Sequence, residues 1–291
     1  MPCWIYVPDL IRKIFNFVDK FVPTDAQLGE NERQSTVFLT KAGPVPVFYN
    51  PYRHVAACTV PQNLHLHAAR VPMSRILDRQ PQIQIVPTYE GIKDKTFPVV
   101  SLVKDMTFAL VDLTEAPETL AALKPSEAPE MELDSEWNGS FTGALYYKKH
   151  NPMVQENEPT IHTIQARMIT QNIEDPGTGS ACCTLACYLA LDEMRALKPR
   201  SKPETTKQEG DEETELVSKT KDVKLEETKS STNTPKFERH VYAIQQGVEM
   251  GRLCTIAVEV DLKTAEDGSK SIVNVTLSGR ACFFARGELM L

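Results

Sequence analysis

The sequence predicts an α+β fold in which a mostly antiparallel sheet curls around an apolar helix. The first observation is the string IEDPGTGSACCTLACYLAL, residues 173–191, where a glycine-bearing loop opens into a run with almost no polar residue. The second is that most other patterned segments favour strands. A helix without a polar face must be covered on all sides. Strands that precede and follow the helix in the chain can cover it if their sheet curls.

Before the apolar helix, groups of β-branched and aromatic residues between chain breaks predict short strands. They are expected at residues 35–40, 45–50, 54–60, 81–87, 97–103, 106–113, 143–149 and 160–169. A short helix is expected at residues 116–123, started by Pro117 and Glu118. Residues 1–22 have apolar side chains at helical spacing, which predicts a helix that packs on its own domain. A membrane-surface or partner helix is the alternative, but its cationic content is low.

After the apolar helix, a clear strand pattern returns at residue 255. One face of residues 255–262 consists of Ile256, Val258, Val260 and Leu262. Such period-two alternation predicts a half-buried strand. Residues 263–270 are expected to form a hairpin loop, and the chain returns through the alternating Val273, Val275 and Leu277. Residues 281–289 close the chain.

Residues 198–236 form a polar segment between the helix and the last strands. Their larger apolar residues are Leu216, Val217, Val223 and Leu225. So little apolar surface cannot offset the conformational entropy that is lost on ordering, and we predict a disordered insertion that forms a solvated loop. A phosphorylated or partner-binding segment is the alternative.

Composition excludes several classes of partner and compartment. The formal net charge of -7 disfavours a broad basic surface, and therefore nucleic acid as the main partner. No apolar run reaches the roughly 18 residues of a membrane span, so no membrane partner is expected. The N-terminus lacks the apolar core and cleavage site of a secretory signal. The seven cysteines are odd in number, and Cys182, Cys183 and Cys187 crowd the helix, which indicates a reducing compartment and a cytoplasmic protein.

The loop before the apolar helix is a candidate site for a small carboxylate. Backbone N–H groups and the dipole at a helix N-terminus attract anions. Gly177 and Gly179 let a ligand approach the backbone closely. Ser180 either donates to the ligand or caps the helix, and Asp175 either accepts from the ligand or holds the turn. No lysine follows, so this is not a phosphate loop of the GxxxxGK[ST] type.

Three histidines, His54, His65 and His67, lie close together in the first half of the chain. The His-x-His spacing of His65 and His67 can hold a metal ion. However, no cysteine or carboxylate lies at a suitable ligand spacing nearby in the sequence. We therefore expect no metal site.

Several strings in the chain resemble signature segments of the phenazine-biosynthesis PhzF-like family. They are MTFALVDLTEAPETLAAL (106–123), EDPGTGSACCTLACYLAL (174–191), QQGVEMGR (245–252) and LSGRACFFARGEL (277–289). They occur in the order that the family has, so the resemblance covers roughly residues 97–291 apart from the insertion.

The resemblance implies a two-domain fold related to diaminopimelate epimerase. Each domain of that fold curls a mostly antiparallel sheet around a central helix, and the active site lies in the cleft where the two helix N-termini face each other. In this chain we expect an N-terminal domain at residues 1–96, divergent and incomplete, and a C-terminal domain at residues 97–291 that contains the insertion.

The resemblance also implies an activity and a site. The family isomerises a small cyclic amino acid by a proton shift without a cofactor, so we expect no cofactor and a small carboxylated substrate. Carried over by motif, Asp175, Gly179 and Ser180 line the substrate pocket, with the carboxylate at the Ser180 end of the helix. A homodimer is implied as well.

The sequence departs from the family at the positions that carry catalysis. Aligned on NERQSTVFLT, residues 31–40, the family's acid/base glutamate is Ser35 here, and serine cannot exchange a proton near neutral pH as a tuned carboxylate does. The family's Gly-His-Pro turn is missing, so the first half is shortened through divergence or a gene model that lacks exons. Pro176 stands where related racemases have a cysteine, and Cys182 and Cys183 are expected to be buried core residues.

Two hypotheses of function follow, and whether the chain is an enzyme stays open between them. The first is a PhzF-like isomerase of a small carboxylated metabolite. The second is a catalytically degraded relative that acts by binding. They differ in whether the first half supplies a carboxylate or imidazole that faces Asp175.

Overall fold

The computed structural model describes residues 34–40, 43–50, 54–137, 141–153, 160–197, 236–265 and 269–280. The strands are β1 (Gln34–Thr40), β2 (Gly43–Asn50), β3 (Val55–Thr59), β4 (His65–Pro72), β5 (Thr96–Val103), β6 (Met106–Asp112), β7 (Phe141–Lys149), β8 (Ile161–Thr170), β9 (Ile173–Asp175), β10 (Lys236–Gln246), β11 (Cys254–Thr264) and β12 (Lys270–Arg280). The helices are α2 (Met73–Leu77), the 3₁₀ turns η2 (Pro81–Ile85) and η3 (Pro87–Gly91), α3 (Glu118–Ala122) and α4 (Gly179–Leu197).

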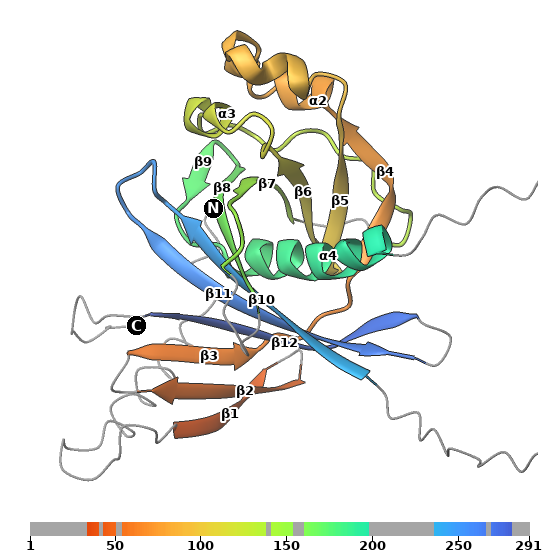
Figure 1. The fold of residues 1–291 in the computed structure, drawn as a ribbon, viewed down its shortest axis with the longest axis vertical. Helices are drawn as coiled ribbons and strands as arrows, with labels where there is room; N and C mark the ends of the chain where they lie inside the picture. The colour runs from red at the N-terminus through yellow and green to blue at the C-terminus, as the bar shows by residue number, and fades with distance from the viewer. Residues whose placement is uncertain are drawn as a thin grey trace, which may run out of the picture.

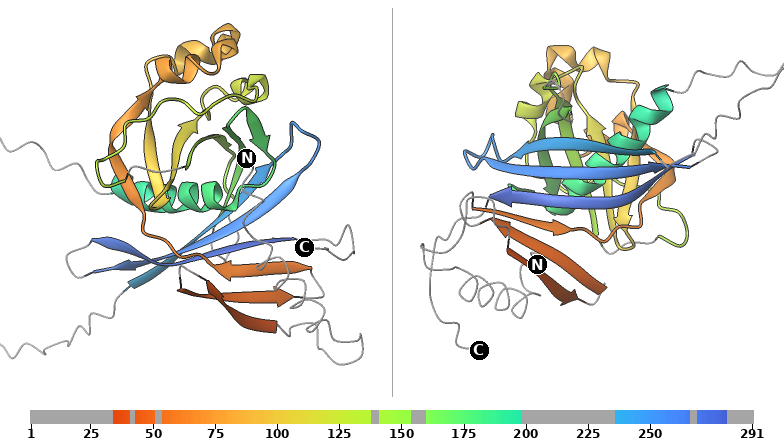
Figure 2. Two further views of the ribbon diagram at one scale, coloured as in Figure 1. Left: turned by 180° about the vertical axis from the view of Figure 1, so that it is seen from behind. Right: turned by 60° about the horizontal axis from the view of Figure 1, so that its bottom comes forward.

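The described strands form one continuous, strongly bent sheet. Its order is β1-β2-β3-β12-β11-β10-β8-β7-β6-β5-β4, with β9 paired to β8. The pairs β6–β7 and β8–β10 are parallel, and the other pairs are antiparallel. In Figures 1 and 2, α4 lies between the strands β4–β8 on one side and β10–β12 on the other, while β1–β3 extend the sheet beyond β12.

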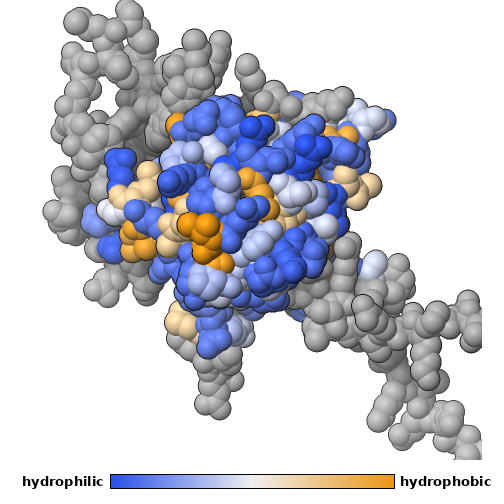
Figure 3. Space-filling model, turned by 90° about the horizontal axis from the view of Figure 1, so that it is seen from above, coloured by the Kyte–Doolittle hydropathy of each residue, from blue (hydrophilic) through white to orange (hydrophobic). Residues whose placement is uncertain are grey.

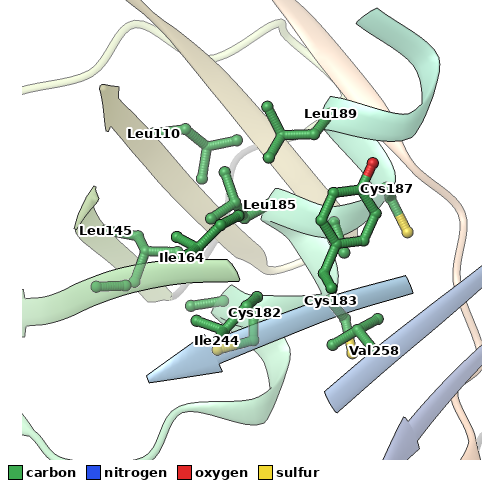
Figure 4. Close-up of a cluster of buried hydrophobic side chains, with 14 of the residues drawn as sticks. Leu110, Leu145, Ile164, Cys182, Cys183, Leu185, Cys187, Leu189, Ile244 and Val258 are labelled. Carbon is green, nitrogen blue, oxygen red and sulfur yellow. The ribbon is translucent and has the colours of Figure 1, made fainter. Parts of the chain in front are cut away.

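Helix α4 is buried along most of its described length. Every residue from 181 to 187 is fully buried, because the segment has no polar face to present to water. Its side chains share one core cluster with residues of β5–β8 and β10–β12. Figure 4 shows Leu185 among Leu110 and Ile164, and Cys183 beside Val258. The strands on both sides of the helix therefore contribute to a single core.

A second core lies on the opposite face of β5–β7. There the alternate residues Val99, Ala109 and Tyr146 pack with Met73 and with side chains of η2 and α3. Because β5 and β6 are buried on both faces, they are nearly continuous apolar runs rather than alternating ones.

The contacts of β4 cross the boundary that we expected between residues 96 and 97. β4 pairs with β5, and the second core contains residues from both sides of that position. In the described part of the chain, residues 65–96 thus share a core with residues beyond position 96. The division into two domains, each with a central helix, stays a prediction.

Most sequence-predicted elements are confirmed, with two exceptions. Residues 81–87 are the 3₁₀ turns rather than a strand, because Pro81 and Pro87 each begin a turn. The side chains of β11 alternate as expected, but Val273 of β12 is exposed since the register shifts by one residue beside it. The predictions for residues 1–22, 198–235 and 281–289 lie outside the described residues.

The outer surface over the second core is mainly hydrophilic. Seen from above in Figure 3, apolar residues occur there in small separate groups. Within the described ranges, no helix combines the length and the apolar character that crossing a membrane requires.

The burial of α4 leads to a prediction about thiol reactivity. Burial raises the pKa of Cys182 and Cys183, and raises that of Cys187 to about 12. In the native protein we expect iodoacetamide to modify these thiols far more slowly than the half-buried Cys58 and Cys254. Peptide mass spectrometry over a time course measures each rate.

The denatured protein is the control, because all five thiols should then react at similar rates. Native labelling of Cys183 as fast as Cys254 would show that the sheet does not cover the helix.

Candidate functional site

The three sequence-predicted site residues lie on one short loop and the helix that it starts. β9 ends at Asp175, residues 176–178 form the turn, and α4 begins at Gly179 with Ser180 as its second residue. β9 is held against β8 through the pairing of Asp175 with Met168. The structure therefore brings Asp175, Gly179 and Ser180 together at the N-terminus of the buried helix.

The carboxylate of Asp175 holds the turn. Its Oδ1 accepts a hydrogen bond from the Gly177 N–H at 3.1 Å, and its Oδ2 accepts one from the Thr178 hydroxyl at 2.6 Å. This is the Asx-type arrangement, one of the two roles that the sequence allowed. Both carboxylate oxygens are thus engaged within the loop.

Ser180 does not cap the helix, which corrects one of its two expected roles. Ser180 lies inside α4, so Thr178 occupies the capping position, and the carbonyl of Thr178 accepts from the N–H of Cys182 at 3.1 Å. A Cβ added to Gly179 would lie 2.8 Å from Cδ2 of Leu277 on β12. Glycine at the helix start therefore lets the Leu277 side chain of β12 pack closely against it.

The segment QQGVEMGR lies directly against this loop. Oε1 of Gln246 accepts a hydrogen bond from the Thr178 N–H at 2.6 Å. Gln246 is fully buried, and its Nε2 has no hydrogen-bond partner among the residues that the structure describes. A buried donor without an acceptor lowers the stability of the fold by about 1–3 kcal/mol. A ligand atom that accepts from Nε2 would remove this cost.

Gly247 makes the close approach of the two segments possible. It has a φ of +70°, and a Cβ there would lie 2.3 Å from the carbonyl oxygen of Arg252 and 3.2 Å from Cβ of Pro176. The N–H of Arg252 donates to the Gly247 carbonyl at 2.8 Å, which closes the turn. Two of the strings that carry the family resemblance therefore meet at this loop.

A buried ion pair between Arg167 of β8 and Glu174 of β9 holds β9 in place. Nε and Nη2 of Arg167 donate to the two carboxylate oxygens of Glu174 at 2.9 and 2.6 Å, and Nη1 donates to the Leu120 carbonyl at 2.7 Å. Both charged side chains are about 95% buried. The sequence pattern did not predict this pair, although Arg167 is the one arginine in the strand expected at 160–169. Removing one partner of such a pair typically costs about 3–5 kcal/mol.

The cysteines near the loop do not form a two-thiol proton-exchange pair. Cys182 is fully buried, and burial, with smaller effects of Cys254 and Asp175, raises the pKa of its thiol. Cys254 is half-buried, with its sulfur against Gly177, and burial raises its pKa too. The expectation that Cys182 and Cys183 are core residues is confirmed. Thiols with raised pKa values are poor bases near neutral pH.

Ser35 lies far from the loop across the sheet. It is exposed on β1, next to Thr36. From Thr36 the pairing runs across the sheet to β12, through Val47 of β2 and Cys58 of β3 to Leu277 of β12. Neighbouring strands are about 4.7–4.9 Å apart, so three steps separate β1 from β12 by about 14 Å. The aligned position of the family's glutamate therefore does not approach Asp175.

A small pocket lies elsewhere along α4. It has a volume of about 130 Å³ and is lined in part by Leu189, His150, His162 and Tyr242. Leu189 follows Gly179 by ten residues, which is about 15 Å along a helix. Ligand pockets usually measure about 300–1,000 Å³, so this cavity is small for a ligand site.

A polar cluster that the sequence did not reveal joins β4 to the segment after α3. Asp134 lies beside both His65 and His67, whereas His54 is not part of this group. Burial lowers the pKa of His67, and a hydrogen bond from His65 lowers the pKa of Asp134. The carboxylate that the sequence lacked is thus supplied from 69 residues further along the chain.

Comparison with known proteins gives only distant similarities. No family model matches the chain, and no curated protein matches it. A phenazine biosynthesis protein of the PhzF family from Bacillus anthracis shares 14% identity, with a TM-score of 0.43 over 90% of this chain and 70% of that one. A protein described as a predicted epimerase from Pseudomonas aeruginosa shares 15% identity, with a TM-score of 0.43 over 90% and 69%. Function has to be judged from the chain's own residues.

The contacts of Gly247 yield a test of the loop geometry. We expect Gly247→Ala to destabilise the protein by more than Gly251→Ala, because both glycines have a positive φ but only Gly247 lacks room for a Cβ. Backbone strain alone costs about 1–2 kcal/mol, and overpacking adds about 1–3 kcal/mol at Gly247. Urea unfolding measures both variants.

Gly251→Ala is the matched control, since nothing lies within 4 Å of its added Cβ. Equal destabilisation of the two variants would contradict the close packing of Gly247 against Arg252 and Pro176.

Proposed function

We propose that this chain is a PhzF-like protein that binds a small carboxylated metabolite at residues 175–180. The observation that carries the proposal is the buried Gln246 amide beside the loop, whose Nε2 lacks an acceptor among the described residues. A ligand carboxylate supplies such an acceptor. Because Nε2 is covered by protein atoms, a ligand reaches it only when the atoms around it move.

The start of α4 supplies the rest of the anion site. The first N–H groups of any α-helix have no partner within the helix, and the helix dipole places partial positive charge there. Ser180, a residue of intermediate burial, adds a hydroxyl. The charge of Asp175 does not oppose a bound anion fully, because hydrogen bonds from Gly177 and Thr178 already stabilise it.

Isomerisation of that metabolite is the second candidate function. Its support is the contact between two strings that resemble the family's signatures, made through Thr178 and Gln246. A proton shift also needs an acid/base group opposite the bound ligand. Ser35 is too distant for that role and is no acid, so binding without catalysis is the function that the described residues favour. The homodimer and the cytoplasmic location stay predictions.

A thermal-shift titration with 3-hydroxyanthranilate and other small cyclic carboxylates tests the binding site. A ligand at 100 times its Kd adds about 2.7 kcal/mol of stability. We expect wild type and Ser180→Asn to gain stability with the ligand, and Ser180→Asp to gain none, because a negative charge at the helix start repels the carboxylate.

An aspartate in the first turn of a helix favours folding, so loss of the shift in Ser180→Asp does not reflect an unfolded variant. Gln246→Glu keeps the acceptor for the Thr178 N–H but removes the donor, and should also lose the shift. A ligand that stabilises all four proteins equally binds elsewhere, and the proposal would then be wrong.

Proton exchange with solvent separates binding from isomerisation. We expect no deuterium incorporation when a bound cyclic carboxylate is incubated with the wild type in D₂O, since Ser35 leaves the site without its aligned carboxylate. Mass spectrometry of the recovered ligand measures incorporation, with the free ligand as the blank. Deuterium uptake above the blank that Ser180→Asp abolishes would establish an isomerase and replace the binding-only function.

A further inference from the structure

His65, His67 and Asp134 form a compact cluster at the edge of the sheet. The two histidines are two residues apart on β4, so their side chains lie on the same face, with ring centroids 4.8 Å apart. Oδ2 of Asp134 lies 2.7 Å from Nε2 of His65 and 3.8 Å from Nδ1 of His67. Three potential ligand atoms, one from each residue, all lie within 4.8 Å of one another.

The surrounding hydrogen bonds orient these atoms toward one another. The Asp134 N–H donates to Nδ1 of His67 at 3.1 Å, so Nδ1 carries the lone pair of the neutral ring and Nε2 carries the proton. That Nε2 donates to the hydroxyl of Ser101 at 2.9 Å, and Ser101 is in turn hydrogen-bonded to Thr107 at 2.6 Å. A ligand histidine is typically held in this way by a partner on its second nitrogen.

The carboxylate and the second ring are held as well. The Ala68 N–H donates to Oδ1 of Asp134 at 3.3 Å, which leaves Oδ2 toward the two rings. The ring of Trp137 stacks on His65 with the centroids 4.4 Å apart and the planes 5° from parallel. His67 is fully buried, while the side chains of His65 and Asp134 are about one-third exposed. One side of the cluster is therefore open to solvent.

We propose that His65, His67 and Asp134 bind a divalent transition-metal ion such as Zn²⁺. Bonds of about 2.0–2.2 Å to imidazole nitrogen and carboxylate oxygen place tetrahedral ligand atoms roughly 3.3–3.5 Å apart. The separations of 2.7 and 3.8 Å lie on either side of that value, and all three ligand atoms lie within 4.8 Å of one another. Metal binding therefore requires the side chains to adjust and the Asp134 backbone N–H to turn away from Nδ1 of His67. The ion replaces the His65–Asp134 hydrogen bond and the bond from the Asp134 N–H to His67.

Three protein ligands and an open side leave a coordination position for water or an external ligand. That is the arrangement of an open zinc site rather than of a closed structural one. The site does not depend on the proposed carboxylate binding, because none of its residues belongs to the loop at residues 175–180.

Titration of the metal-free full-length protein with ZnCl₂ tests the proposal. In a Trp4→Phe background the emission comes from Trp137 alone, since the chain has two tryptophans. We expect saturable binding by calorimetry and a matching change in Trp137 emission as the ring of His65 turns to the ion. Ser101→Ala should weaken binding by about 10–100-fold, the usual effect of losing an outer partner.

His65→Ala and Asp134→Asn should weaken binding more than Ser101→Ala does, and the exposed His150→Gln should leave it unchanged. X-ray absorption of the zinc-loaded wild type gives a readout that needs no variant. We expect nitrogen and oxygen ligands at about 2.0–2.2 Å and none at the 2.3 Å of a zinc–sulfur bond. Absent binding, sulfur ligation, or affinity that survives Asp134→Asn would overturn the proposal and leave the cluster a hydrogen-bonded connection between β4 and the segment at residue 134.

Discussion

Helix α4 has no face that can lie against water, and the arrangement of the sheet follows from this constraint. Its residues 181–187 are all buried, so apolar side chains must reach it from several directions. β5–β8 do so from one side and β10–β12 from the other, and the sheet bends between β8 and β10 to allow both. The parallel pairing of β8 with β10 lies at this bend, with the whole of α4 in the connection between the two strands. A helix with one polar face would have needed only one of these layers.

The same constraint fixes the loop that leads into the helix. The fully buried part of α4 begins at Ala181, only two residues after the helix starts, and three separate sets of contacts hold the turn that leads into it. Asp175 bonds within the loop, Gln246 accepts from Thr178, and the Arg167–Glu174 pair anchors β9. Glycine at 247 removes the side chain that would collide with the backbone of Arg252, and glycine at 179 leaves room for the side chain of Leu277. An anion site at a helix N-terminus and a well-packed helix entry therefore share these features, which is why a ligand titration is needed to distinguish them.

Local patterns in the sequence were enough to locate most strands and the buried helix. The alternation in β11 and the apolar run of α4 are properties of neighbouring residues, and the structure preserves them. The predictions that failed depended on partners distant in the chain. The string PQIQI has strand-like residues, yet Pro81 starts a 3₁₀ turn whose Ile83 is buried in the second core. Val273 alternates correctly in the sequence, but a register shift against β11 exposes it.

The two candidate sites differ in the same way: one is formed by residues close in sequence and the other by residues distant in sequence. Asp175, Gly179 and Ser180 are close in sequence, so a motif could place them together on one helix start. Asp134 is far from His65 in sequence, and no spacing rule joins them. Only the packing of the segment after α3 against β4 brings the carboxylate to the rings. His65 and His67 come before residue 97, where the family resemblance begins, and Asp134 comes after it. The cluster therefore joins two segments that were expected to belong to different domains, and it does so through contacts that neither segment's own pattern reveals.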